Sequence, residues 1–229
     1  MLFDKLDLIE EDAQTPTSQT INFVKDSKLK DILVTWAILN DLNIKRNRPS
    51  ALEDYIKKTK EIILAQTSSA NWRNIPAYSA FRELHQKYGK SPEPSSIENL
   101  IEFIKEKGDL PNINSFVDLY NVFSALTGIS VGAHDLAKLS GDVRLTVLDR
   151  DLPFVPMNQS TPMTAKKGEL AYVDDEGILC RLDIKQSNRT KVTKDTRDVF
   201  LIFEGNSELQ QGYIEEKMEE FKELVKKYL

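Results

Sequence analysis

A chain of 229 residues, 40% hydrophobic and 29% charged, has the composition of an ordinary globular protein and can bury a sizeable core. No apolar run approaches the ~20 residues of a membrane-spanning helix, so no membrane association is expected. The net charge of −5 argues against nucleic-acid binding over the whole surface, although a local basic patch is compatible with RNA binding. A single cysteine and an acidic N-terminus without the basic region of a signal peptide predict a cytoplasmic protein.

The first 44 residues favour extended structure. Residues 1–20 are polar and predict a short strand or arm followed by a loop. Residues 21–44 mix β-branched and aromatic side chains, which favours one or two strands, the stronger over 32–39, although a helix is also compatible with this composition. The basic turn 45–49 that follows is either a solvated loop or a phosphate contact.

Five stretches repeat apolar residues at helical spacing. Ser95 and Glu98 form a capping box ahead of the third. Gly108 and Gly128 stand where a left-handed residue would end the third and the fourth. In the last stretch glutamates crowd the first half and lysines the end, which suits the helix dipole. The expected helices span residues 50–67, 79–88, 96–107, 115–127 and 208–228.

After the fourth helix the pattern changes to the alternation typical of strands. Val143, Leu145 and Val147 alternate with other residues, and three later segments predict further strands separated by turns, among them a hairpin turn at 174–177. The last segment is continuously apolar, as in a strand buried on both faces. Together the patterns predict an α/β (α+β) fold, with helices flanking a mixed β-sheet and an amphipathic C-terminal helix. The three later segments are 169–175, 177–183 and 198–205.

Few residues of the chain point to chemistry by themselves. His134 precedes Asp135, and an imidazole beside a carboxylate is either a base or ligand, or a histidine that caps the next turn. His85 lies on the polar side of a short helix and is expected at the surface, whereas Cys180 predicts a buried, inert thiol. These three residues have no metal-ligand spacing, and the chain has no phosphate-binding glycine loop. The sequence therefore predicts no metal and no cofactor.

Three segments together carry a resemblance to a known family. NSFVDLYN (114–121) is followed by GISVGAHDLAKLSGD (128–142) and then by DDEGILCRLDIKQSNRTKVTKDTRDV (174–199). In this order they resemble the B3/B4 domain of the bacterial phenylalanyl-tRNA synthetase beta subunit, and more closely the free-standing B3/B4 proteins that lack the rest of the synthetase. The resemblance implies one B3/B4-like domain over residues 1–229. Its core spans about 72–205, preceded by strands and a helix (1–71) and followed by a helix (207–229).

In this family the domain is a helix-flanked β-sheet that hydrolyses tyrosine wrongly attached to tRNA. The resemblance therefore implies a trans-acting aminoacyl-tRNA deacylase, with tRNA as a weakly bound, salt-sensitive partner and the aminoacyl group as the substrate. The alternative is a non-catalytic module that binds tRNA or an amino acid. The family has a histidine where this chain has Gly132, and an aromatic residue where it has His134. His134 is expected to point to the same side of the strand as position 132.

The resemblance and the residue types together suggest the residues of the site. The start of the helix at Asn114 and Ser115 is expected to hold a carbonyl or oxyanion on unpaired backbone N–H groups, and His134 to orient or deprotonate a water. The residues expected to bind substrate are Asn112, Gln186 and Glu176, the last through the α-amino group. The residues expected to contact RNA are Lys45, Arg46, Arg48, Arg73, Arg82, Arg189 and Lys191.

Overall fold

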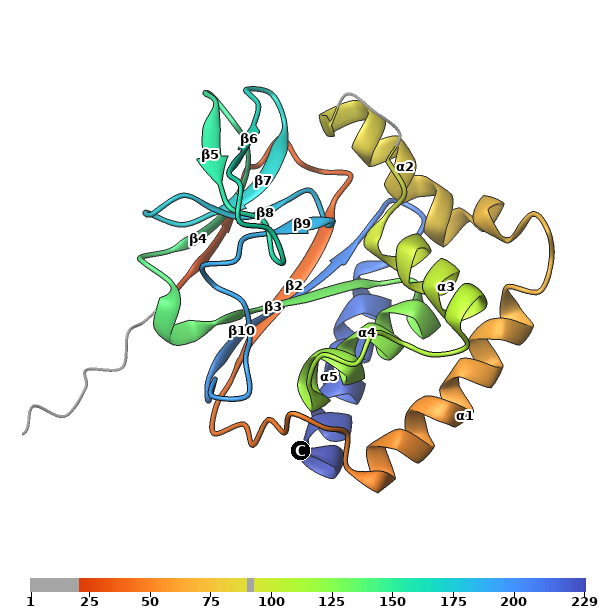
Figure 1. Cartoon of the computed structure of the whole chain (residues 1–229). Helices are drawn as coiled ribbons and strands as arrows, with labels where there is room; N and C mark the ends of the chain where they lie inside the picture. Colours follow the sequence, from red (N-terminus) through yellow and green to blue (C-terminus); the bar gives the residue numbers. More distant parts are fainter. Residues whose placement is uncertain (1–20, 90–92) are drawn as a thin grey trace, which may run out of the picture.

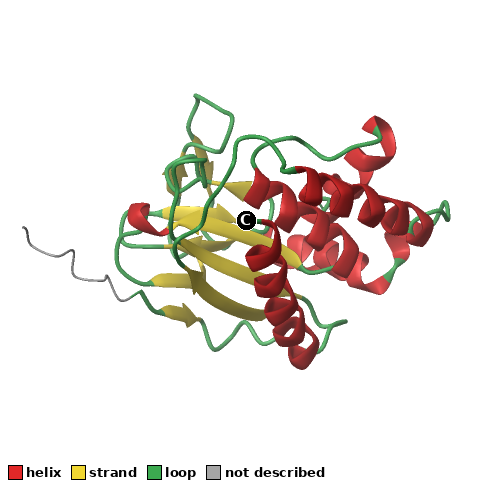
Figure 2. Ribbon diagram, turned by 90° about the horizontal axis from the view of Figure 1, so that it is seen from below, coloured by secondary structure: helices red, strands yellow, loops and turns green. Residues whose placement is uncertain are grey.

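The computed structural model describes residues 21–89 and 93–229, so the strand or arm expected within residues 1–20 lies outside the described residues. In the described part, Figure 1 shows the strands gathered on one side of the molecule and the helices on the other. Figure 2, which colours strands yellow and helices red, shows the same separation from below. The predicted fold class, helices packed on a mixed β arrangement, is confirmed.

The helices lie close to their predicted positions. α2 starts three residues earlier than predicted, because Pro76 has the fixed φ that suits the first turn of a helix. Ser95 and Glu98 form the predicted capping box, and Gly108 and Gly128 end their helices at φ values of 72° and 73°. The helices are α1 (Ser50–Gln66), α2 (Pro76–Gly89), α3 (Ser96–Lys107), α4 (Ser115–Thr127) and α5 (Gln211–Tyr228).

The described strands form three sheets. The first has the order β1-β4-β7-β8-β9, with β1 and β4 parallel and the other neighbours antiparallel. The second is antiparallel with the order β2-β10-β3, and the third is a small hairpin of β5 and β6. The strands are β1 (Phe23–Lys25), β2 (Leu33–Leu39), β3 (Ser130–Asp135), β4 (Val143–Val147), β5 (Leu152–Phe154), β6 (Met163–Ala165), β7 (Leu170–Val173), β8 (Ile178–Arg181), β9 (Lys185–Gln186) and β10 (Val199–Gly205).

Strand β10 runs through the core. All seven of its residues are buried, which confirms the prediction of a strand covered on both faces. Phe203 of β10 packs against Phe123 of α4 and Phe221 of α5, with ring centroids 5.3 to 6.0 Å apart in the three pairs. The buried residues of α5 are Ile214, Met218, Phe221 and Val225, which form the apolar face of the amphipathic C-terminal helix that the sequence predicts.

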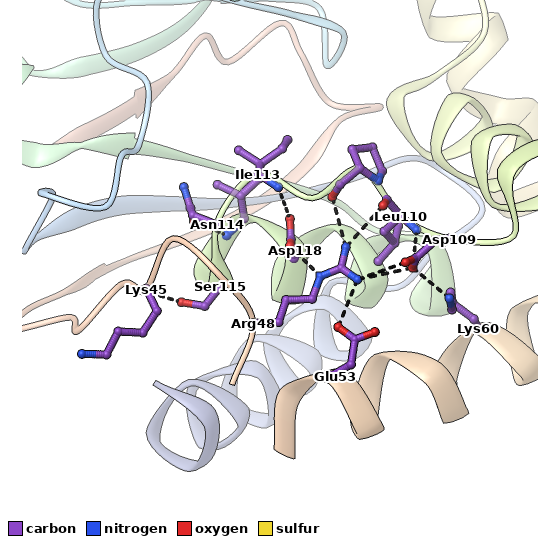
Figure 3. Close-up of polar contacts among 12 residues, drawn as sticks. Lys45, Arg48, Glu53, Lys60, Asp109, Leu110, Ile113, Asn114, Ser115 and Asp118 are labelled. Carbon is purple, nitrogen blue, oxygen red and sulfur yellow. Dashed lines mark hydrogen bonds and ion pairs between the residues drawn. The ribbon is translucent and has the colours of Figure 1, made fainter. Parts of the chain in front are cut away.

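The basic turn before α1 is fastened to the start of α4 (Figure 3). Ser115 donates its backbone N–H to the carbonyl of Lys45, and its Oγ accepts from the Lys45 N–H, both at 2.9 Å. The guanidinium of Arg48 lies 2.7 Å from Asp118 Oδ2 and 3.3 Å from carboxylate oxygens of Glu53 and Asp109. The side chains of Arg48 and Asp118 are 4% and 0% exposed. Arg48 therefore joins α1, the 109–111 loop and α4 from inside.

This position does not suit the expected role of Arg48 in RNA contact. Its guanidinium also donates to the carbonyls of Leu110 and Pro111, so its donors already have partners within the chain. Burial raises the pKa of Asp118, although the hydrogen bond from Arg48 favours the charged carboxylate. Neither the solvated loop nor the phosphate contact expected of turn 45–49 holds at Arg48, whose buried side chain has a structural role.

We predict that Arg48→Ala lowers the free energy of unfolding by about 3–5 kcal/mol, because it leaves the Asp118 carboxylate buried without its cation. Urea unfolding measures the change. Arg46→Ala, two residues away at an exposed position, is the matched control and should change stability by less than about 0.5 kcal/mol. A similar small cost for both variants would contradict a buried anchor at Arg48.

Candidate functional site

Two cavities that share part of their walls lie between the helices and the strands. The inner chamber has a volume of about 180 Å³ and is lined by residues of α3, α4, β3, β7, β8 and β10, among them Gly132, His134 and Glu204. The outer basin has a volume of about 340 Å³ and is lined by Asn114 and by the segment 191–194. Both are lined by Tyr120, Met157 and Gln186. The two cavities therefore meet at these three side chains.

His134 lines the inner chamber from β3. Gly132 lines the same chamber, so the two positions do face the same side as predicted. The His134 Nδ1 atom lies 2.9 Å from Thr190 Oγ1 and 3.2 Å from Gln186 Nε2. Burial lowers the pKa of His134 to about 4, with Asp174 opposing and Arg189 adding to the effect. The imidazole is therefore neutral at physiological pH.

The start of α4 is occupied by the chain itself. Asn114 caps the helix, since its Oδ1 accepts from the Val117 N–H at 2.9 Å. The Ser115 N–H and Oγ are both engaged by Lys45, and Ser115 is fully buried. Asn114 lines the outer basin, but Ser115 lines neither cavity. The expectation that open N–H groups at Asn114 and Ser115 hold an oxyanion therefore does not fit this geometry.

Glu176 and Asn112 lie apart from His134. Glu176 sits in the turn between β7 and β8, is 59% exposed at its side chain, and pairs with Arg189 at 3.2 Å. It lines a separate surface cleft with Arg144 and Asp175, and it lines neither the inner chamber nor the outer basin. Asn112 is exposed and also lines neither chamber. Of the three expected substrate-binding residues, the structure brings only Gln186 to His134.

The turn that carries Glu176 is a hairpin turn, as its composition predicts. Asp174 Oδ1 accepts the backbone N–H groups of Glu176 and Gly177 at 3.0 and 3.1 Å. Gly177 has a φ of 134°, a value that favours glycine. Asp174 also pairs with Arg189 at 2.6 Å, so the carboxylates of this turn have a structural part.

The inner end of the chamber holds polar residues that sequence reasoning missed. Glu204 of β10 accepts a hydrogen bond from the Tyr172 hydroxyl, and Asp183 accepts from Ser96 Oγ at 2.8 Å. Ser96 Oγ also lies 3.0 Å from Ser130 Oγ. The single glutamate within the apolar run of β10 was a signal for such a site, because a carboxylate is almost never fully buried unless it has a partner.

His85 belongs to the structure behind this end of the chamber. Its Nε2 lies 2.5 Å from Asp183 Oδ1 and its Nδ1 lies 2.6 Å from the carbonyl of Glu93. The prediction of a surface histidine is therefore wrong. The helical pattern of α2 gave no sign that the polar side would face a carboxylate 98 residues further along the chain.

Cys180 also lines the chamber, from β8. Burial raises the pKa of its thiol well above the ordinary value, with the carboxylates of Asp183 and Glu204 acting in the same direction. Cys180 is half-buried, and because the reactive thiolate form is disfavoured, an inert thiol stays a prediction.

Of the seven cations expected to contact RNA, Arg48 is the buried anchor described above and Lys45 is exposed but lines neither cavity. The other five fall into two groups. Arg73 pairs with Glu102, Arg82 pairs with Glu98, and Arg189 pairs with Asp174 and Glu176, so these guanidinium groups are engaged within the chain. Arg46 and Lys191 are exposed, line the outer basin, and form no ion pair with any residue in 21–89 or 93–229. Lys194 lies beside them on the basin wall and pairs with Asp195.

We predict that ionisation of Glu204 destabilises the fold. Burial raises its pKa from 4.5 to about 7, with Asp183 adding to the effect. Because the pKa of Glu204 is higher in the folded state than in the unfolded state, its protonated carboxyl contributes to the free energy of unfolding. This contribution is complete below pH 4.5 and is lost as the pH rises through about 7. Urea unfolding across this range should show a loss of roughly 3 kcal/mol in the wild type. Glu204→Gln, which still accepts from Tyr172, should remove this part of the pH dependence, and equal slopes for both proteins would contradict it.

The chain is similar to a known domain family and to two curated proteins. Residues 80–217 match the family model described as "B3/4 domain". The chain is similar to the phenylalanine–tRNA ligase beta subunit of Mycoplasma pneumoniae (30% identity over 92 residues) and of Ureaplasma parvum serovar 3 (29% over 114 residues). These matches cover 40% and 48% of this chain, but 11% and 15% of the two ligase subunits.

Among solved structures, the chain is similar to an N-terminal fragment of the phenylalanyl-tRNA synthetase beta subunit from Pyrococcus horikoshii. The TM-score is 0.45 and the sequence identity 16%, over 89% of this chain and 50% of that one. In the described residues of this chain, no helix is long and apolar enough to cross a membrane, and no three His, Cys, Asp or Glu side chains are grouped to hold a metal ion.

Proposed function

The chain belongs to the B3/4 domain family, and from this premise we propose that it is a trans-acting deacylase that hydrolyses the ester of mischarged aminoacyl-tRNA. One observation supports the proposal most directly. The smaller inner chamber and the larger outer basin with its basic residues meet at Gln186, beside the neutral imidazole of His134. An aminoacyl ester has the same two parts, a small side chain and a long anionic chain, joined at the reacting carbonyl.

In the proposed binding mode, each of these parts occupies one of the two cavities. The aminoacyl side chain enters the inner chamber, where apolar walls end in the polar residues around Glu204. The 3′ end of the tRNA lies in the outer basin, where Arg46, Lys191 and Lys194 offer charge to its phosphates. The ester carbonyl then lies at the junction formed by Tyr120, Met157 and Gln186, within reach of His134.

The reaction needs little from the protein. Water adds to the ester carbonyl carbon, the bond from this carbon to the ribose oxygen breaks, and a proton from the water ends on the ribose oxygen. Holding the ester in one geometry and stabilising the developing oxyanion account for most of the acceleration required. Because this ester is already labile, a site without a nucleophilic triad is adequate. A cytoplasmic location and a single functional domain over residues 1–229 belong to the same proposal.

We predict that the purified protein deacylates at least one mischarged tRNA from a panel of aminoacyl-tRNAs. In single-turnover measurements with that substrate, His134→Ala should slow hydrolysis about 10²-fold or more, because the polar group at the junction is lost. Asn188 lies two residues after Gln186 and lines neither cavity, so Asn188→Ala serves as the control. An unchanged rate in His134→Ala would show that the histidine is only structural.

The second candidate is a module that binds tRNA or an amino acid without hydrolysis. The occupied N–H groups at the start of α4 favour it, because they remove one source of oxyanion stabilisation. Protection of a mischarged tRNA from spontaneous hydrolysis, in place of acceleration, would identify this function.

We predict that tRNA binding is weak and falls steeply with salt. Arg46→Ala and Lys191→Ala should each reduce the slope of log K against log salt by about 0.7, the value for one phosphate contact on a single strand. Lys57→Ala, an exposed lysine on α1 away from both cavities, is the matched control and should leave the slope unchanged. Equal slopes for all four proteins would place the RNA elsewhere on the surface.

A further inference from the structure

Gln186 makes the contact that defines the chemistry of His134. Its Nε2 donates to the carbonyl of Ala133 at 2.8 Å and lies 3.2 Å from His134 Nδ1. The carbonyl oxygen of Ala133 is an acceptor only, so the amide atom beside it must be the nitrogen. The same –NH₂ group has a second N–H, and the Nδ1 atom lies where this second hydrogen can be accepted.

Accepting a hydrogen bond at Nδ1 determines where the ring carries its proton. A neutral imidazole has one N–H and one acceptor nitrogen, so an accepting Nδ1 leaves the hydrogen on Nε2. The Thr190 hydroxyl, 2.9 Å from Nδ1, can turn to donate to the same atom. The Thr190 carbonyl accepts the Asp135 N–H at 2.9 Å, which fastens this loop to β3. Ring, amide and hydroxyl are thus held together.

The Nε2 atom faces the chamber. Within residues 21–89 and 93–229, neither a side chain nor the backbone hydrogen-bonds Nε2, and every fully buried side-chain nitrogen or oxygen there has a partner. Nε2 must therefore meet open space, and His134 lines the inner chamber. The residue is only 2% exposed and lines the inner chamber but not the outer basin, so this space is the inner chamber.

We infer that Gln186 is a positioning residue that holds His134 in its Nε2–H tautomer, so that the ring presents a hydrogen-bond donor to the substrate. This replaces the expectation that His134 is a general base. Its catalytic meaning rests on the proposed function: Nε2–H donates to the ester carbonyl oxygen and stabilises the oxyanion as water adds. The proton of the attacking water passes to the leaving ribose oxygen, and the histidine keeps its own proton throughout.

The tautomer is measured without any activity. The chain has two histidines, so NMR of ¹⁵N-histidine-labelled protein shows two rings, and the His134→Gln variant assigns them. We expect His134 to show a protonated Nε2 and an unprotonated Nδ1 at neutral pH. In Gln186→Glu, the carboxylate would accept from Nδ1–H, so the pattern should reverse. In Gln186→Ala the preference should weaken, while Asn188→Ala should match the wild type.

The kinetic test separates a donor from a base. If His134 donates, Gln186→Glu turns an acceptor nitrogen towards the substrate, and single-turnover hydrolysis should fall about 10²-fold. If His134 is a base, the same variant should keep or raise the rate. An Nδ1–H tautomer in the wild type, or a reversed ring without loss of rate, would overturn the inference. Absence of hydrolysis with every mischarged tRNA would instead remove the proposed function and leave the tautomer to be judged by NMR.

Discussion

The candidate site depends on one register, the antiparallel pairing of β10 with β3. It sets Phe200 opposite His134 and Glu204 opposite Ser130, so both ends of the inner chamber come from the same two strands. A slip of one residue would turn every side chain of a strand to its other face. β10 is buried throughout and packed by α4 and α5, and the hydrophobic core therefore fixes the geometry of the polar chamber.

The chamber combines groups whose charges are suppressed by burial. Burial lowers the pKa of His134 to about 4, so its imidazole is neutral near neutrality, and it raises the pKa of Glu204 to about 7, so this carboxyl is only partly ionised there. Asp183 differs, because hydrogen bonds from His85 and Ser96 outweigh its burial and lower its pKa. Apart from Asp183, which pairs with His85, the inner walls thus mainly offer hydrogen-bond donors and acceptors, while exposed cations line the outer basin. Such a division suits a ligand with an uncharged part and an anionic part.

Local signals were sufficient for the helices and the longer strands, but not for the short strands β5, β6 and β9 or for the partners of polar side chains. The capping box at Ser95 and the glycine at 128 predicted helix ends, because caps involve residues close in sequence. Arg48 and His85 were misplaced because their partners, Asp118 and Asp183, lie 70 and 98 residues away. The turn that holds Glu176 could be predicted because its contacts are local. The contact between Gln186 and His134 could not, because the two residues are 52 positions apart.

The anchor at Arg48 has a consequence for the exposed cation two residues before it. Because Ser115 holds the backbone of Lys45 and Asp118 holds the side chain of Arg48, Arg46 projects from a segment that is already ordered. A ligand that reaches Arg46 does not have to freeze a flexible loop, so less conformational entropy opposes its binding. Loss of the Arg48 guanidinium would loosen this segment and so weaken the binding of a ligand to Arg46, although Arg48 does not itself contact that ligand. In an alanine scan of basic residues, the interior arginine would then resemble a contact residue, and stability measured alongside affinity tells the two apart.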